Sequence, residues 1–278
     1  MNRKVKSRGR TTGLLLPLRK EFMLARFHFR KRKERIQQIA KARTVVSPGT
    51  RTTHIIAVRK KAYLKAAIRC ANSIWYKSPE MQIVIHIDRH LANYSDYLIG
   101  RLDRKDRARL QLEESFNSWQ ELKLRVILHD LGENDSFSDA DLYWNVPIPL
   151  SNSGYYFAAE NSLLNREPYS KIIQDCKIQL HPDSFMANSS FVALGKFPSK
   201  SEFVDEVESN FVKVRNQLAI GTYDEAVRSK VLRLSEQIVL SISINKHSNH
   251  FKTLKLTDDP MDGGPAESYY LGTTKGWA

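Results

Sequence analysis

The sequence is poor in cysteine, in long apolar runs and, near its start, in acidic residues. Its two cysteines, Cys70 and Cys176, stand far apart and outside any Cys-x-x-Cys spacing. Neither a disulfide framework nor a zinc site is therefore indicated, and a reducing compartment is expected. The early apolar run Leu14–Leu18 is too short to span a membrane, and Arg19 and Lys20 follow it instead of a small-residue cleavage site. We expect no export, no transmembrane anchor and a cytoplasmic location.

The first 50 residues contain only two acids, Glu21 and Glu34, so they carry much of the net charge of +14. From Arg19 to about Arg43, apolar residues alternate with cations in a pattern compatible with a basic amphipathic helix. The alternative is a solvated tail without fixed structure. Such an arm could meet anionic lipid at the inner membrane face, nucleic acid or an acidic partner, and charge alone does not choose among them.

The rest of the chain has the composition of a globular domain. Hydrophobic residues make up 41% of the sequence and charged residues 27%, which argues against a wholly disordered or membrane-embedded chain. A length of 278 residues allows one domain with an appendage, and Val46–Thr50 reads as a break between the two. We predict a basic N-terminal arm over residues 1–50, helical or disordered, and a single α/β domain over residues 51–278.

The predicted domain opens with a strand, a helix and a second strand. His54–Val58 is an apolar run of strand length, apolar residues then recur at helical spacing over 63–75, and Gln82–Ile87 is a second apolar run that ends at Asp88. Two parallel strands joined by a helix begin many nucleotide-binding α/β folds. Further along, the pattern predicts a helix over 101–118, a strand over 122–128, a strand-like segment over 185–195, and helices over 203–217 and 223–239.

Asp139-Ala140-Asp141 is the motif with the clearest chemistry. Two carboxylates one residue apart can both reach a hard cation, and such cations also bind substrate phosphates. The simpler interpretation is that these acids cap a helix or a turn. The two close histidine pairs, His86 with His90 and His247 with His250, lack further ligands, so we assign them no role.

Four segments, in order along the chain, resemble the GT-A glycosyltransferases. Residues 137–149, with Asp139 and Asp141 followed by Pro147 and Pro149, resemble the DxD segment of that family. Three later segments are similar to a strand with a sugar-facing Asn, to an acidic-plus-Gln helix start, and to a terminal aromatic-Gly-Lys-Trp segment; these are 185–192, 235–240 and 270–277. The resemblance covers about Thr52 to the end and implies one GT-A-like, Rossmann-like nucleotide-diphospho-sugar transferase domain.

The resemblance also implies a donor site. Asp139 and Asp141 would hold Mn²⁺ or Mg²⁺ on the diphosphate of a nucleotide-sugar donor, with the metal neutralising charge on the leaving group. Lys275 would assist as a point charge. The nucleotide base would lie by the end of the first strand, from Val58 to Lys60.

On the sugar and acceptor side, the resemblance implies a role for three further residues. Asn188 would hydrogen-bond donor sugar hydroxyls, and Glu236 or Gln237 would contact the acceptor or the reacting face. The alternative for Asn188 is ordinary turn hydrogen bonding. The alternative for Glu236 is that of an acid favoured by the dipole at a helix start.

The implied activity is a metal-dependent, hexosyltransferase-like glycosyltransferase that moves a sugar from a nucleotide-sugar donor to a glycan or other acceptor. Its basic arm would contact an anionic membrane peripherally. The alternative is a protein that binds nucleic acid or a protein partner through the arm, with a non-catalytic transferase-like domain. The basic excess lies mainly in the arm, and no recognised nucleic-acid motif is present there, which counts against nucleic acid.

Overall fold

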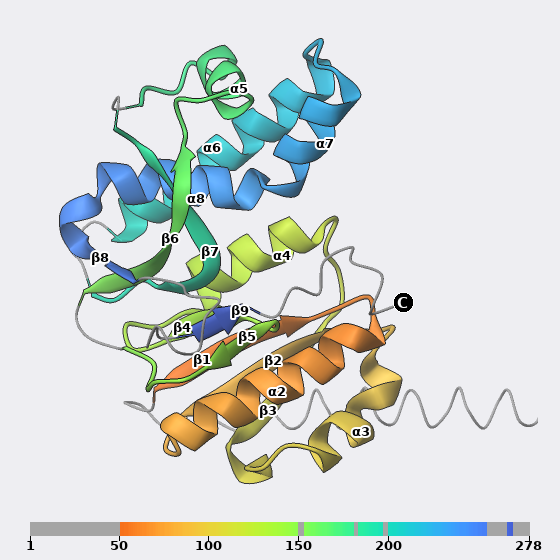
Figure 1. The fold of residues 1–278 in the computed structure, drawn as a ribbon. Coiled ribbons are helices and arrows are strands. Elements are labelled where there is room, and N and C mark those ends of the chain that lie inside the picture. The colour runs from red at the N-terminus through yellow and green to blue at the C-terminus, as the bar shows by residue number, and fades with distance from the viewer. Residues whose placement is uncertain (1–50, 150–152, 181–182, 197–199, 255–265, 269–278) are drawn as a thin grey trace, which may run out of the picture.

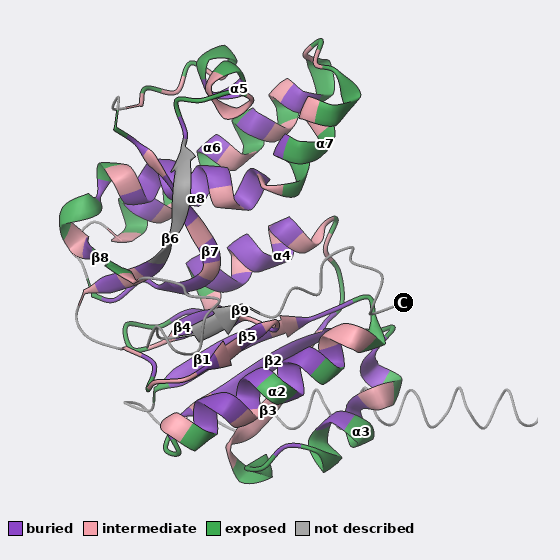
Figure 2. Ribbon diagram, viewed as in Figure 1, coloured by how far each residue is buried: buried purple, intermediate pink, exposed green. Residues whose placement is uncertain are grey.

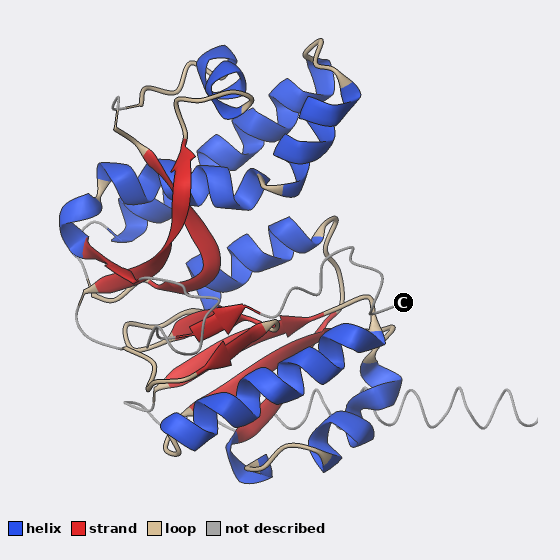
Figure 3. Cartoon of the chain, viewed as in Figure 1, coloured by secondary structure: helices blue, strands red, loops and turns tan. Residues whose placement is uncertain are grey.

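A computed structural model describes residues 51–149, 153–180, 183–196, 200–254 and 266–268 of the chain. Helices lie on both sides of a seven-stranded sheet, which makes the described part a mixed α/β structure as predicted (Figures 1 and 3). The predicted arm, residues 1–50, lies outside the described residues. Within the described ranges, no helix is both long enough and apolar enough to cross a membrane.

The large sheet has the strand order β3-β2-β1-β4-β7-β6-β8. Its strands are β1 (Thr52–Ala57), β2 (Gln82–Asp88), β3 (Ala108–Glu113), β4 (Ser136–Asp139), β6 (Gly154–Leu163), β7 (Phe185–Ala193) and β8 (Phe251–Leu254). The strands β3, β2, β1 and β4 run parallel, and β7 is antiparallel to β4. The sheet therefore has a parallel half and a mixed half, with β4 at the junction.

Helix α2 (Lys61–Lys77) connects β1 to β2 and confirms the predicted strand–helix–strand unit. Its apolar residues recur every three or four positions, which places them on one face of the helix. Leu64, Ile68 and Ile74 are buried on that face. The helix ends before Pro79, because a proline disfavours helical geometry at the residue that precedes it, here Ser78.

Of the remaining helices, α3 lies beside α2, and the others lie on the other side of the sheet and at its mixed end (Figure 1). They are α3 (Ser95–Gly100), α4 (Trp119–Arg125), α5 (Tyr169–Asp175), α6 (Lys200–Ile220), α7 (Glu225–Arg233) and α8 (Ser235–Lys246). A second, two-stranded sheet pairs β5 (Leu142–Trp144) with β9 (Ala266–Ser268).

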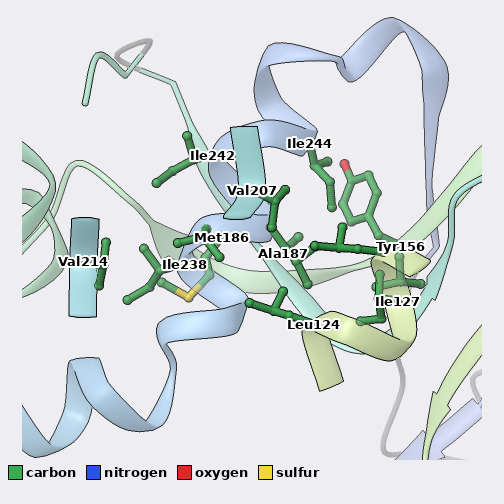
Figure 4. Close-up of a cluster of buried hydrophobic side chains, with 14 of the residues drawn as sticks. Leu124, Ile127, Tyr156, Met186, Ala187, Val207, Val214, Ile238, Ile242 and Ile244 are labelled. Carbon is green, nitrogen blue, oxygen red and sulfur yellow. The ribbon is translucent and has the colours of Figure 1, made fainter. Parts of the chain in front are cut away.

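The large sheet separates two hydrophobic cores. Ile55, Ile85 and Phe191 belong to the core under α2, while Phe137 and Val192 belong to the core under α4, α6 and α8. Neighbouring strand residues enter opposite cores because side chains alternate across a strand. Buried residues accordingly line both sides of the sheet (Figure 2). Figure 4 shows how α4, β7, α6 and α8 meet in the second core, through Leu124, Met186, Val207 and Ile238.

Three sequence-based predictions of secondary structure are wrong. The segment 101–118 contains the strand β3 instead of a helix, because Ala108 and Leu110 alternate with polar residues and face one core. The segment 122–128 belongs to helix α4 and a following π-helical turn, Val126–Asp130, instead of a strand. The segment 223–239 is divided between α7 and α8, which meet at Leu234.

Candidate functional site

The carboxyl ends of the parallel strands meet at one edge of the sheet, which is the usual ligand edge of an open α/β sheet. Asp139 is the last residue of β4, and its backbone partner is Ile56 near the end of β1. Asp141 follows in the turn before β5. Strand β4 therefore places both acids of the motif at this edge.

Buried hydroxyl groups hold the turn that carries the two acids. The Trp144 indole Nε1 donates to the Ser138 hydroxyl at 3.1 Å, and the Trp144 backbone N–H donates to the Ser73 hydroxyl on α2 at 3.0 Å. The Ser136 and Thr53 hydroxyls are 3.0 Å apart between β4 and β1. The polar residues of β4 are thus buried and paired, and they fix the turn against its neighbours.

Lys123 of α4 forms an ion pair with the first acid of the motif. Its Nζ lies 2.8 Å from Oδ1 and 3.0 Å from Oδ2 of Asp139. The Lys123 side chain is 3% exposed and that of Asp139 is 30% exposed, so water shields this pair only weakly. The lysine supplies a fixed positive charge at the centre of the site.

Asp141 keeps a proton more readily than an ordinary aspartate. Burial and the charge of Asp139 raise its pKa to about 7, and Lys123 acts in the opposite direction. The same two acids, after burial, raise the pKa of the Tyr63 phenol at the start of α2. Negative charge is therefore concentrated where the two carboxylates meet.

Glu236 lies in the first turn of α8, yet it is only 2% exposed. Its Oε1 accepts a hydrogen bond from the Ser189 hydroxyl at 3.4 Å, and its Oε2 has no hydrogen-bond partner among the described residues. Burial raises its pKa to about 7, Lys123 lowers it and Asp139 raises it. Glu236 is thus part of the same electrostatic cluster as Lys123 and the two aspartates.

Asn188 and Gln237 are sequence neighbours of Ser189 and Glu236, respectively. Asn188 is on β7 next to Ser189, and its Oδ1 accepts hydrogen bonds from the backbone N–H and the hydroxyl of Ser190. These bonds fit the local role expected from sequence as the alternative to sugar binding. Gln237 follows Glu236 on α8 and is half-buried.

The remaining predicted contacts lie at the strand end and in the tail. Val58 is buried just past β1, and the next residue, Arg59, has a positive φ of 72° with its N–H bonded to Asp88 Oδ2 at 2.8 Å. The end of β2 therefore holds the loop after β1 in place. Lys275 and the segment 270–277 lie outside the described residues.

Helix α4 is also held by a chain of polar contacts that runs from β1 through β2 and β3 to Arg125. Glu113 at the end of β3 accepts from the Arg125 guanidinium of α4, and its Oε1 lies 2.6 Å from His86 Nδ1. His86 Nε2 in turn lies 2.9 Å from His54 Nδ1. Although burial alone would raise it, the pKa of Glu113 is lowered by His86 and Arg125. Helix α4 is thus held at the ends of two strands by two ion pairs, each with one buried partner.

The two aspartates fit a divalent cation by their chemistry. Both supply hard carboxylate oxygens, and Mg²⁺ often binds one or two carboxylates together with waters and substrate phosphates. The raised pKa of Asp141 comes first from burial and then from the charge of Asp139, and a cation would offset that charge. Among the described residues, however, no group of three or more His, Cys, Asp or Glu could hold a metal ion by itself. Any cation would therefore share its coordination with ligand or water.

Lys123 was not predicted as a site residue, because its segment was interpreted as a strand. A signal was present in Ser118-Trp119-Gln120-Glu121, which has the spacing of a helix capping box. The Ser118 hydroxyl indeed accepts from the Glu121 backbone N–H at 3.2 Å. Lys123 lies among the apolar residues that follow this cap, and such a position indicates a buried cation that is paired with an acid.

Comparison with known proteins gives structural matches only. No protein-family model and no curated protein sequence matches the chain. The galactosyltransferase LgtC, in complex with donor and acceptor sugar analogues, matches with a TM-score of 0.52 and 10% identity over 82% of this chain and 89% of LgtC. An active-site mutant of LgtC matches with a TM-score of 0.51 and 8% identity over 80% of this chain and 88% of the mutant chain. The chain therefore has the GT-A fold, the fold of the glycosyltransferases whose motifs its sequence segments resemble.

Proposed function

We propose that this protein is a metal-dependent glycosyltransferase that moves a sugar from a nucleotide-sugar donor to a glycan or other acceptor. The supporting observation is that Asp139, Asp141, Lys123 and Glu236 form one charged cluster beside the carboxyl edge of a GT-A sheet. A purely structural role for these residues is a poor explanation, because it would place two buried groups, Lys123 and Glu236, beside two half-buried aspartates at a cost in desolvation.

On the donor side, Asp139 and Asp141 would hold Mn²⁺ or Mg²⁺. When bound, the metal would neutralise charge on the leaving nucleoside diphosphate. Lys123 orients Asp139 by bonding both of its oxygens and adds a positive charge that needs no metal. Val58 and Lys275 remain predicted donor contacts, at the base and the diphosphate.

On the acceptor side, Glu236 is suited to handle a proton. With a pKa of about 7, its carboxyl group can donate or accept a hydrogen bond near neutral pH. Its Oε2, which has no hydrogen-bond partner within the part of the chain that the structure describes, offers a position for a hydroxyl group of a sugar. Gln237 would complete this side, whereas Asn188 would hydrogen-bond hydroxyl groups of the donor sugar through its amide nitrogen, since its oxygen is already bonded to Ser190.

The location of the protein and the role of its arm remain predictions. The arm of residues 1–50 would bring the enzyme to an anionic membrane surface from the cytoplasmic side, where lysine and arginine are attracted to acidic lipids.

Nucleotide titration tests the proposed function directly. Purified protein is titrated with UDP, GDP and CDP, with and without Mn²⁺, beside an Asp139→Asn/Asp141→Asn variant that keeps the shape of both side chains. We expect metal-dependent binding of one nucleotide by the unchanged protein. The variant should bind it at least about tenfold more weakly, because two charged ligands of the cation are lost.

An Asp103→Ala/Asp106→Ala variant is the matched control, since it removes two exposed acids before β3. Its affinity should equal that of the unchanged protein. Absence of binding of all three nucleotides, or equal binding by the Asn variant, would contradict a metal and nucleotide site at Asp139 and Asp141.

A further inference from the structure

Helix α4 uses three polar side chains to contact three separate elements around the candidate site. Lys123 bonds Asp139 at the end of β4, and Arg125 bonds Glu113 at the end of β3. The third side chain, Gln120, lies one turn before Lys123 and so on the same side of the helix. Lys123 and Gln120 are both buried, so their polar atoms need partners inside the protein.

Gln120 finds its partners in the last turn of α7. Its Nε2 lies 3.2 Å from the carbonyl oxygen of Leu232 and 3.5 Å from that of Arg233. The last carbonyls of a helix have no partner within the helix, so a side-chain donor there stabilises its end. The bond joins residues more than a hundred positions apart and ties α4 to the corner between α7 and α8.

This corner leads directly into Glu236. The Ser235 hydroxyl also donates to the Leu232 carbonyl, at 2.9 Å, and the Ile238 N–H donates to the Leu234 carbonyl as α8 begins. Glu236 lies in sequence between Ser235 and Ile238, in the first turn of α8. Any movement of the corner away from α4 would therefore move Glu236 as well.

We propose that Gln120 is a positioning residue that fastens the α7–α8 corner to α4 and thereby keeps Glu236 within reach of Lys123 and Asp139. The inference depends on the proposed function only for the role given to Glu236. The arrangement places two neighbouring side chains of one short helix on the two sides of the site. Lys123 sets the donor side, through Asp139, and Gln120 sets the acceptor side.

The matched pair of variants is Gln120→Met and Gln217→Met. Each replaces a glutamine by a side chain of similar size without hydrogen-bonding groups. Gln217 is half-buried on α6 and donates to the Tyr223 hydroxyl at 3.1 Å, away from Glu236. The readouts are the pKa of the Glu236 carboxyl, followed by ¹³C NMR, and the hydrogen exchange of the Ile238 amide. Neither readout needs nucleotide, so the result is independent of whether the nucleotide titration succeeds.

In Gln120→Met we expect the corner to open more often and Glu236 to meet water. Its pKa should fall from about 7 toward the ordinary 4.5, because burial is the main cause of the raised value. The Ile238 amide should exchange about tenfold faster, as expected when one buried hydrogen bond is lost. Gln217→Met should change neither value.

A second variant covers the case in which Gln120→Met fails to fold. Gln120→Glu has the same shape, but it can donate to the α7 carbonyls only when protonated. After correction for the intrinsic exchange rate, the Ile238 amide should then be more protected from exchange at acid pH than at alkaline pH. The proposal is overturned if Glu236 keeps its pKa and Ile238 its exchange rate in a folded Gln120→Met protein. It is equally overturned if Gln120→Glu protects Ile238 alike at every pH.

Discussion

Replacing Lys123 by Met is expected to lower the free energy of unfolding by about 3 kcal/mol. The ammonium group of Lys123 bonds both oxygens of Asp139, and the lysine side chain is 3% exposed. Removing one partner of a buried pair leaves the other charge without compensation, which typically costs about 3–5 kcal/mol. The lower end of that range applies here, because Asp139 is 30% exposed and water can reach it.

The same substitution should change the titration of the acids around it. Lys123 lowers the pKa values of both Asp141 and Glu236, which burial and Asp139 raise to about 7. Without the lysine, both carboxyl groups should hold their protons to higher pH. The site would then lose its positive charge and much of its negative charge together.

Urea unfolding at neutral pH measures the stability effect. The control is Lys65→Met on α2, where the lysine is exposed and a change within about 0.5 kcal/mol is expected. A double variant, Lys123→Met/Asp139→Asn, should recover part of the loss, because it leaves no buried charge unpaired. Equal stability of Lys123→Met and Lys65→Met would show that the pair contributes nothing to the fold.

The sequence predicted the parts of the site that follow local patterns. The apolar runs of β1 and β2 and the helical spacing of α2 define the strand–helix–strand unit, and these elements agree with the structure. The strand β7 and the helix α6 also lie where the patterns placed them. Local pattern did not predict the strand β4, because the hydroxyl group of its residue Ser136 pairs with Thr53 of β1, far away in sequence.

The polar chain behind α4 could not be predicted, for a related reason. His86 stands near His90 in sequence, but its partners are Glu113 and His54 on neighbouring strands. Such pairings depend on sheet order and register, which local periodicity does not specify. The segment 101–118 was predicted as a helix, and the alternation of Leu110 with polar neighbours was the signal that should have indicated the strand β3.

Replacing Glu113 by Gln is expected to lower the free energy of unfolding by about 2–3 kcal/mol at pH 7. The carboxylate is 4% exposed and joins His86 of β2 to Arg125 of α4. An amide has no charge to offer either partner, so the guanidinium loses its ion pair. The effect stays below the full cost of breaking a buried pair because Arg125 is 42% exposed and can turn to water.

This loss should depend on pH in a defined direction. The pKa of Glu113 is lowered in the fold by His86 and Arg125, which together outweigh burial. Between that lowered value and the ordinary 4.5, the unfolded chain binds more protons than the folded one, so stability rises with pH. The advantage of Glu113 over Gln is therefore complete above pH 4.5 and disappears as the pH falls through the folded pKa.

His54 adds a separate acid sensitivity that both proteins share. Burial, then the charges of His86 and Arg109, lowers its pKa well below 6.5, so the folded protein holds it neutral. Stability should fall in both proteins as the pH drops below 6.5, where the unfolded chain takes up this proton. Subtracting the two pH profiles removes the contribution of His54 and isolates that of Glu113.

Urea unfolding from neutral pH to below pH 4.5 provides these profiles, with Glu114→Gln as the control. Glu114 is the next residue, 66% exposed, and its ion pair with Arg89 at 3.8 Å is open to water. Such a pair contributes about 0–1 kcal/mol, so the control should follow the unchanged protein at every pH. If Glu113→Gln also follows it, the buried chain from His54 to Arg125 does not hold α4. If the loss persists unchanged under acid conditions, it comes from altered packing and not from the charge of Glu113.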